Sequence, residues 1–245
     1  MQYNILHMDR KKYVIVVAGG SGTRMGTSKP KQFLELGGKA ILRRTIEVFL
    51  EACPEINVVT VLPEEHMDYW KQYCYSTDFI CPQVLVKGGI TRFHSVRNAL
   101  EKVPDGALVA IHDGVRPLLS AGLVNRLFEA AESSPGVIPI IPCVDTLKVL
   151  RKKVWDDGSE TYSAVLGQSA DRSVLYGAQT PQVFQSETIR KAYTQAYDTA
   201  FTDDASVLER YGKSLSYLIG ERLNIKITTQ EDIVLAEAVL NIRKA

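Results

Sequence analysis

A run of glycines mixed with cationic side chains is the part of this 245-residue sequence best suited to chemistry. It follows a β-branched run at residues 13–17 and lies within residues 16–34, which read VVAGGSGTRMGTSKPKQFL. Its glycines are Gly19, Gly20, Gly22 and Gly26, and its cations are Arg24, Lys29 and Lys31. Glycines let a backbone turn tightly and aim successive N–H groups into a concave anion site. Cations beside that concavity predict a polyanionic ligand, most simply a nucleoside triphosphate.

Two familiar phosphate-binding motifs do not describe this loop. A Walker A loop needs a lysine directly after its second glycine, but Thr27 follows Gly26. A dinucleotide fingerprint needs Gly-x-Gly-x-x-Gly, and the glycines at 20, 22 and 26 are spaced one residue too widely. A merely tight strand-to-helix turn would account for the glycines but would leave the cations unexplained. We therefore favour a triphosphate-binding loop of another kind.

Two further polar clusters follow apolar runs: GGITRFHS at 88–95 and HDGVRP at 112–117. Ligands of parallel α/β sheets bind beyond the carboxyl ends of the strands, so these clusters should converge with the glycine loop. Asp113 is the best candidate for a carboxylate near a Mg²⁺-bound triphosphate, because Mg²⁺ binds through one or two carboxylates plus phosphates. A helix cap or a turn is the alternative role for Asp113. The neighbouring His112 is expected to be a packed supporting residue.

The sequence contains no Ser–His–Asp or Cys–His pattern typical of nucleophilic hydrolysis. A phosphate monoester is mostly dianionic at neutral pH, so it can attack without a general base. The difficulty of such a reaction is repulsion between two polyanions. Positioning, Mg²⁺ and Arg or Lys charge would then supply the catalysis.

An α/β framework must hold these clusters. Short β-branched runs alternate with amphipathic runs, which predicts a mostly parallel, doubly wound sheet. The expected strands lie at 13–17, 58–62, 83–86, 108–111 and 137–142, and the expected helices at 40–51, 64–73, 95–102 and 122–132. Farther along we expect a helix at 186–197, an acidic turn at 202–209, strands at 215–219 and 224–228, and a terminal helix from about residue 229.

Residues 149–172 interrupt this alternation with a polar, turn-rich stretch. Asp157 and Gly158 are typical of a hairpin turn, and residues 149–155 and 162–166 are the expected strands of a β-arm. A disordered insertion is the alternative, but Trp155 and Tyr162 make the stretch too apolar for it. We expect one domain over residues 1–245, with 149–172 as its extended arm.

Composition excludes several classes of protein. The formal net charge of +1 provides no global field that favours nucleic acid or a membrane surface. The sequence has no apolar run of membrane-spanning length, and its first residues lack the apolar segment of a signal peptide. Four cysteines without a C-x-x-C pair indicate free thiols in a reducing cytoplasm. We therefore expect a cytoplasmic protein with small-molecule partners.

A set of motifs, in this order, carries a resemblance to a known family: AGGSGTRMGTSKPKQFLEL, GGITRFHSVRNAL, HDGVRP, VDTLK, AQTPQVF, TDDASVLE and NIKITTQEDI. Over residues 13–240 the sequence closely resembles the 2-C-methyl-D-erythritol 4-phosphate cytidylyltransferases of non-mevalonate isoprenoid biosynthesis. The resemblance implies a Rossmann-like fold. It also implies transfer of CMP from CTP to the sugar phosphate, with Mg²⁺ and with release of pyrophosphate.

The resemblance further implies roles for particular residues. Arg24 and Lys31 would stabilise charge that builds on the α-phosphate and the leaving pyrophosphate, and Arg172 and Lys226 would orient the attacking phosphate. The nucleotide side would comprise Ala18, Gly19, Gly20, Gly22, Gly89, Ser95, Asp113, Gly114 and Thr180, with Asp113 near the ribose, the metal or the sugar substrate. The sugar phosphate would further contact Arg116, Thr146 and Thr202. Members of the family are homodimers that exchange arms, so Thr146 and Arg172 would complete the partner's site.

Departures from the family's usual pattern keep one alternative open. Gly114 and Val115 stand where the family usually has two alanines, Tyr176 stands where it often has tryptophan, and the arm is longer than usual. Val115 resembles the related ribitol-5-phosphate cytidylyltransferases, whereas GGITRFHSVRNAL, DTLK and NIKITTQEDI favour the methylerythritol enzyme. A Rossmann-type oxidoreductase is disfavoured by the glycine spacing, and a non-catalytic nucleotide-binding protein by the full set of cations.

Overall fold

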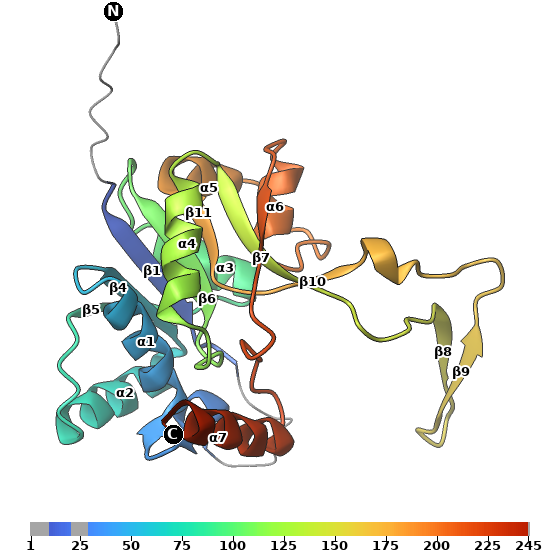
Figure 1. Ribbon diagram of the computed structural model, residues 1–245, viewed down its shortest axis with the longest axis horizontal. Helices are drawn as coiled ribbons and strands as arrows, with labels where there is room; N and C mark the ends of the chain where they lie inside the picture. The colour runs from blue at the N-terminus through green and yellow to red at the C-terminus, as the bar shows by residue number, and fades with distance from the viewer. Residues whose placement is uncertain (1–9, 21–28, 245) are drawn as a thin grey trace, which may run out of the picture.

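A computed structural model of the protein describes residues 10–20 and 29–244. At the centre of these residues is an eight-stranded sheet with strand order β10-β7-β11-β6-β1-β4-β5, in which β12 also pairs with β7 (Figure 1). The strands are β1 (Lys12–Val17), β4 (Asn57–Leu62), β5 (Gln83–Lys87), β6 (Leu108–Asp113), β7 (Gly136–Pro142), β10 (Tyr176–Ala178), β11 (Gln182–Gln185) and β12 (Ser216–Ile219). Only β10 and β11 run antiparallel to their neighbours. The expected α/β class with a mostly parallel sheet is confirmed.

Helices cover both faces of the sheet because side chains alternate along each strand. In β1, Val14 and Val16 belong to one hydrophobic cluster and Ile15 to another. The first cluster includes side chains of α1 (Ile41–Ala52), α2 (Glu64–Ser76) and α4 (Ala121–Ala131). The second includes side chains of α3 (Arg92–Leu100), α5 (Ser186–Ala192) and α6 (Asp204–Arg210). The sheet is therefore doubly wound, as the alternation of strands and helices predicted.

A third hydrophobic cluster fixes the chain beyond the carboxyl end of β6. It joins the small hairpin of β2 (Glu35–Leu36) and β3 (Lys39–Ala40) to α7 (Gln230–Lys244), and these elements lie together at the bottom of Figure 1. Val115 and Ile227 are both buried in this cluster, and the Ile227 backbone N–H donates to the Val115 carbonyl at 2.9 Å. This bond holds the segment just before α7 against the segment that follows β6.

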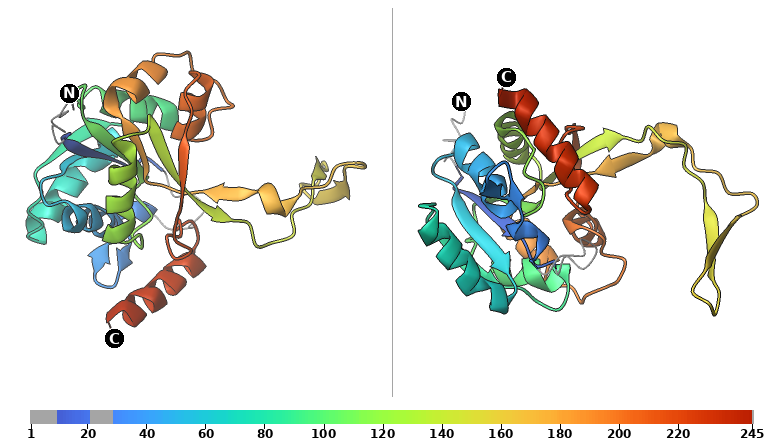
Figure 2. Two further views of the ribbon diagram at one scale, coloured as in Figure 1. Left: turned by 45° about the horizontal axis from the view of Figure 1, so that its top comes forward. Right: turned by 90° about the horizontal axis from the view of Figure 1, so that it is seen from below.

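The arm extends away from the body of the molecule in all the views (Figure 1, Figure 2). It is an antiparallel hairpin of β8 (Leu150–Val154) and β9 (Glu160–Ala164), and a short helix, η3 (Arg172–Val174), lies on its return path. Gly158 turns the hairpin with a φ of 79°. Every residue of both strands is exposed. The hairpin expected from the sequence is confirmed, and its role in dimerisation stays a prediction.

Some element boundaries differ from the expected ones. The helix expected at 95–102 begins at Arg92, because Thr91 caps it by accepting a bond from the His94 N–H. The acidic turn expected at 202–209 contains α6 instead, which Asp203 and Ser206 cap with reciprocal side-chain bonds. The helix expected at 186–197 ends at Ala192, and the strand expected at 224–228 is wrong. Within the described ranges, no helix is both long and apolar enough to cross a bilayer.

Candidate active site

A cavity of about 320 Å³ opens at the carboxyl ends of β1 and β6, where ligands of parallel α/β sheets bind. It brings together eight of the residues predicted for the site: Ala18, Gly19, Gly20, Lys31, Gly89, Ser95, Asp113 and Lys226. It also includes residues that the sequence reasoning did not assign: Val17, Gln32, Ile90, Thr91, Arg92 and Val115. Gln32 and Arg92 lie inside the sequence motifs that predicted the site, so membership of those motifs could have identified them.

The start of the glycine loop is held by the elements on either side of it. The Ala18 N–H donates to the Val61 carbonyl at 2.9 Å, and the buried Gln32 amide donates to the Ala18 carbonyl at 2.9 Å. A Cβ placed on Gly20 would lie 3.7 Å from Lys31 Cε, so the Lys31 stem runs beside the loop. Gly22 and Arg24 lie outside the described residues, and their roles stay predictions.

The loop before α3 needs a glycine and a hydroxyl. The Gly89 N–H donates to Ser95 Oγ at 3.0 Å, and Ser95 Oγ donates in turn to the Thr91 carbonyl at 2.9 Å. A Cβ on Gly89 would lie only 2.4 Å from His94 Cβ, so a larger residue would force the loop away from the helix. Ser95 therefore shapes the loop that borders the cavity as well as lining it.

Asp113 lies among three cations. Its Oδ2 is 2.9 Å from Lys226 Nζ and 3.4 Å from Arg116 Nε, and its Oδ1 is 3.7 Å from Arg92 Nε. Burial acts to raise the pKa of this carboxyl, but the charges of Arg92 and Lys226 outweigh it and hold the pKa well below its ordinary value. Asp113 is therefore ionised at neutral pH, and the group as a whole carries excess positive charge.

His112 supports Asp113 from inside the sheet. Its Nε2 is 3.2 Å from the Arg116 carbonyl, which can only accept, so Nε2 carries the proton. Its Nδ1 then accepts from Thr180 Oγ1 at 2.9 Å, and Thr180 Oγ1 accepts from the Asp113 N–H at 3.1 Å. Burial lowers the pKa of His112 to about 3, so the ring is neutral at neutral pH. The expected supporting role is confirmed for His112, and Thr180 occupies a buried position behind Asp113.

Gly114 and Arg116 are fixed by the backbone around Asp113. The Gly114 N–H donates to the Val17 carbonyl at 2.9 Å, and a Cβ there would lie 3.0 Å from Ala18 Cβ. The small residue at 114 thus lets β1 and β6 approach each other at the cavity. Arg116 Nη1 donates to the Asn224 carbonyl at 2.8 Å, which ties it to the segment that carries Lys226.

Six of the described residues predicted for the site do not line the cavity. Gly114, Arg116 and Thr180 contact residues that do line it. The other three, Thr146, Arg172 and Thr202, are exposed. Arg172 Nη1 donates to the Val144 carbonyl at 3.2 Å, so Arg172 and the segment carrying Thr146 lie together at the base of the arm. Thr202 lies in the turn just before α6. That Thr146 and Arg172 serve a partner's site stays a prediction.

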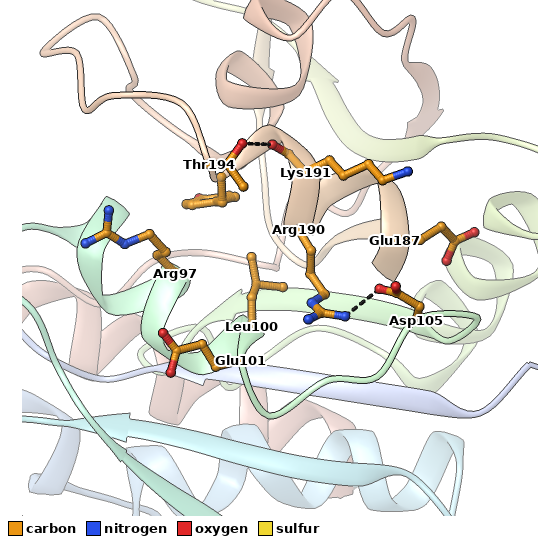
Figure 3. Close-up of a pocket in the computed structure, with 9 residues that line it drawn as sticks. Arg97, Leu100, Glu101, Asp105, Glu187, Arg190, Lys191 and Thr194 are labelled. Carbon is orange, nitrogen blue, oxygen red and sulfur yellow. Dashed lines mark hydrogen bonds and ion pairs between the residues drawn. The ribbon is translucent and has the colours of Figure 1, made fainter.

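A second cavity, of about 380 Å³, lies between α3 and α5 (Figure 3). Its charged residues have opposite signs: Arg97, Arg190 and Lys191 against Glu101, Asp105 and Glu187. Arg190 is paired with Asp105 there, and none of the predicted site residues lines this cavity. The first cavity is therefore the better candidate for a polyanionic ligand, because its described charged residues are three cations and the single carboxylate of Asp113.

The donor set of the first cavity fits a magnesium ion held mainly by phosphates. Among the described residues, no three His, Cys, Asp or Glu side chains are grouped so that they could hold a metal ion. Asp113 offers one carboxylate, whose Oδ1 has Arg92 at 3.7 Å as its nearest ion-pair partner. Mg²⁺ commonly binds through one or two carboxylates and completes its shell with phosphate oxygens and water.

Comparison with known proteins connects this site to one family. The family model described as 2-C-methyl-D-erythritol 4-phosphate cytidylyltransferase matches residues 13–242. A protein of that name from Bacteroides thetaiotaomicron is 44% identical over 230 residues, which cover 94% of this chain and 100% of that protein. One from Clostridioides difficile is 34% identical over 234 residues, with 94% of each chain covered.

Solved structures agree with the sequence comparisons. The 4-diphosphocytidyl-2C-methyl-D-erythritol synthase of Anaerococcus prevotii is similar, with a TM-score of 0.75 and 28% identity over 95% of this chain and 99% of that one. The 2-C-methyl-D-erythritol 4-phosphate cytidylyltransferase of Thermus thermophilus gives a TM-score of 0.69 and 28% identity, with the same coverage. The chain therefore belongs to the 2-C-methyl-D-erythritol 4-phosphate cytidylyltransferase family.

Proposed function

We propose that this protein transfers CMP from CTP to 2-C-methyl-D-erythritol 4-phosphate. A phosphate oxygen of the sugar substrate attacks the α-phosphorus of CTP, and the bond from that phosphorus to the β-phosphate oxygen breaks. The products are pyrophosphate and 4-diphosphocytidyl-2-C-methyl-D-erythritol. The observation that carries the proposal is the cationic cavity at the end of β1 and β6, in a chain that belongs to the family.

The cavity has the charge that such a reaction needs. Two polyanions must approach each other, and Lys31, Lys226 and Arg92 line the space between the glycine loop and Asp113. We assign Lys31 and Arg24 to the charge that develops on the α-phosphate and pyrophosphate. We assign Arg116 and Lys226 to the sugar phosphate. Both side chains form ion pairs with Asp113 Oδ2, so the two cations lie next to each other and could bind one phosphate together.

No general base is required by this reaction, because the attacking phosphate is already ionised near neutral pH. The histidine next to Asp113 supports that reading. His112 is fully buried, is neutral, and has both of its ring nitrogens in hydrogen bonds. It can hold Asp113 in place but cannot reach the substrates.

We propose Mg²⁺ as the metal of the reaction. When bound, it would neutralise charge on the triphosphate and help the pyrophosphate to leave. Asp113 is the described carboxylate of the cavity that would contact it. Lys31 and Lys226 would hold the phosphate groups on either side.

We propose a homodimer in which the arm of each subunit completes the partner's site. Exposed apolar side chains on the arm support this, including Leu150, Val154, Trp155 and Tyr162. A two-stranded hairpin with no cover is at best marginally stable in water, so a second subunit would stabilise it. The arm would then deliver Thr146 and Arg172 to the sugar phosphate, within one nucleotidylyltransferase domain per chain.

We also propose that the enzyme acts in the cytoplasm. The argument rests on the cysteines: Cys53, Cys74, Cys81 and Cys143 are all free. Burial raises the pKa of the Cys74 and Cys81 thiols to about 11, which keeps them protonated and unreactive. A reducing compartment suits such a set of thiols.

Pyrophosphate release tests the function directly. The purified protein is mixed with CTP and Mg²⁺, and with either 2-C-methyl-D-erythritol 4-phosphate or ribitol 5-phosphate. We expect rapid release with the first sugar phosphate and release near background with the second. Release with ribitol 5-phosphate alone would overturn the substrate assignment, and no release with either would overturn the catalytic function.

A further inference from the structure

The Arg92 guanidinium lies between two carboxylates. Its Nη1 and Nη2 donate to the two oxygens of Asp204 at 2.9 and 2.7 Å, in the bidentate geometry that makes such pairs strong. Its Nε is 3.7 Å from Asp113 Oδ1, across the gap to β6. One side chain thus joins the first turn of α6 to the carboxylate of the cavity.

Asp204 is a fixed anchor for this guanidinium. Its side chain is fully buried, and Tyr193 donates its hydroxyl hydrogen to Oδ1. The turn beside it is tied to β11, because Gln182 donates to Asp203 at 2.8 Å and accepts from the Ala205 N–H at 2.9 Å. Thr202, a predicted contact of the sugar phosphate, comes two residues before Asp204. Arg92 therefore connects that turn with Asp113.

We infer that Arg92 is a positioning residue for the sugar-phosphate half of the site, an inference that rests on the proposed function. It holds Asp113 from the Oδ1 side while Lys226 and Arg116 hold it from the Oδ2 side. The carboxylate is thereby fixed, and Lys226 and Arg116 are fixed with it. Without Arg92, Asp113 turns toward the two remaining cations, and α6, which begins just after Thr202, loses its bidentate bond to α3.

A purely structural role does not account for these contacts. Arg92 lines the cavity, and its side chain keeps 31% of its surface accessible. The helix that carries it has other anchors. Thr91 caps α3, and the buried Phe93 ring stacks on Tyr193 with centroids 4.7 Å apart and on Phe201 at 5.5 Å. The position of α3 thus does not depend on the guanidinium.

Arg92→Lys tests the inference, because lysine keeps the charge but cannot make the bidentate pair. We expect the KM for 2-C-methyl-D-erythritol 4-phosphate to rise at least about ten-fold, the change that follows from losing one charge-assisted bond. The Kd for CTP, measured by calorimetry without the sugar phosphate, should stay within about two-fold, because lysine keeps a positive charge near Asp113 and the bonds it cannot make are those to Asp204, close to Thr202.

Arg97→Lys is the matched control. Arg97 lies on the same helix, is exposed, and has its guanidinium 6.0 Å from the Phe93 ring rather than near a carboxylate of the cavity. We expect wild-type KM and Kd values for this variant. A rise in the sugar-phosphate KM in Arg97→Lys equal to that in Arg92→Lys would assign the effect to α3 in general and overturn the inference.

Tyr193→Phe is the second variant, and it decides the matter if Arg92→Lys does not fold. It removes only the hydroxyl that donates to Asp204, so we expect a smaller increase of about three-fold in the same KM. The inference would be contradicted if the sugar-phosphate KM stayed unchanged in every one of these variants that folds. It would also be contradicted if that KM and the Kd for CTP changed equally. A wild-type protein that releases no pyrophosphate would instead contradict the proposed function.

Discussion

The side chains around Asp113 differ in how far they could be predicted from the sequence. Asp113 and Arg116 lie three residues apart in the HDGVRP motif, so their ion pair is a local consequence of the turn after β6. Lys226 is far away in sequence, and tertiary contacts of the segment before α7 with Val115 and Arg116 bring it to Asp113. The pairing of Arg92 with Asp204 depends on tertiary structure in the same way, so no motif spacing could have predicted it.

Lys31→Ala is predicted to act on the chemical step. If Lys31 stabilises charge that develops in the transition state, kcat should fall by roughly 10²–10³-fold while the KM for CTP changes little. Steady-state pyrophosphate release measures both constants. Lys71→Ala is the control, since Lys71 pairs with Asp68 on the exposed surface of α2. A rise in KM with an unchanged kcat would show that Lys31 binds the substrate without stabilising the transition state.

His112 predicts how stability depends on pH. Burial lowers its pKa from 6.5 to about 3, so between these values the unfolded chain binds a proton that the folded chain does not. The free energy of unfolding is therefore unaffected by His112 titration above about pH 6.5. Below that pH it decreases as the pH falls, by up to about 1.4 kcal/mol per pH unit. The depressed pKa of Asp113 acts in the same direction but only at lower pH.

Urea unfolding at several pH values between 7 and about 4.5 measures this slope. His112→Asn is the comparison, because asparagine does not titrate. We expect the variant to be less stable at pH 7, owing to the lost packing, but to lose less stability on acidification. Equal slopes for the two proteins would show that His112 is not the group responsible.

At the scale of elements, the glycine before α3 determines how closely a loop can approach a helix. Gly89→Ala would place a Cβ 2.4 Å from His94 Cβ, so the loop must move. We expect the Kd for CTP to rise about ten-fold and the free energy of unfolding to fall by about 1–3 kcal/mol, as in other overpacked sites. Calorimetry and urea unfolding measure the two effects.

Gly122→Ala is the matched control for that substitution. Gly122 lies in α4, where the nearest atom to an added Cβ is Ser120 Oγ at 3.6 Å, an ordinary contact. Alanine also favours a helix over glycine. We expect unchanged CTP binding and equal or greater stability in Gly122→Ala. Wild-type behaviour of Gly89→Ala would contradict the close approach at Gly89.

The sequence predicted long, strongly patterned elements better than short ones. β1, β4 and β6 are apolar runs buried on both faces of the sheet, and α1 buries one regular face against the core, so their sequence patterns are clear. α6 is only seven residues long, and its capping box has Ser206 where glutamate or glutamine is usual, so the helix signal was weak. Residues 224–228 do not form the expected strand. Their backbone makes one bond to the segment after β6, from the Ile227 N–H to the Val115 carbonyl, and a strand needs a ladder of such bonds.

At the scale of the whole molecule, the contacts within one chain do not explain why the arm is so exposed. It extends from the body of the molecule (Figure 2). Both of its strands are exposed, and Arg172 is not among the described residues that line the cavity. The sequence predicted the hairpin from its turn residues and its apolar positions. What covers the hairpin depends on a second subunit, which no pattern within one chain can place.

Mixing two inactive variants tests the exchange of arms. Lys31→Ala damages a subunit's own cavity, whereas Arg172→Ala damages the site that its arm would complete. Unfolding and refolding the two together should form mixed dimers with one intact site, so activity should exceed that of either parent. Activity of the mixture no higher than the mean of the two parents would contradict exchange.

The central claim is the attack of a sugar phosphate on the α-phosphorus of CTP, and ³¹P NMR of the reaction mixture tests it most directly. With CTP, Mg²⁺ and 2-C-methyl-D-erythritol 4-phosphate, we predict the loss of the three CTP signals and of the sugar-phosphate signal. Pyrophosphate should appear together with two mutually coupled phosphorus signals from a new diphosphate linkage. Formation of CMP without that linkage, or unchanged substrates after prolonged incubation, would contradict the account.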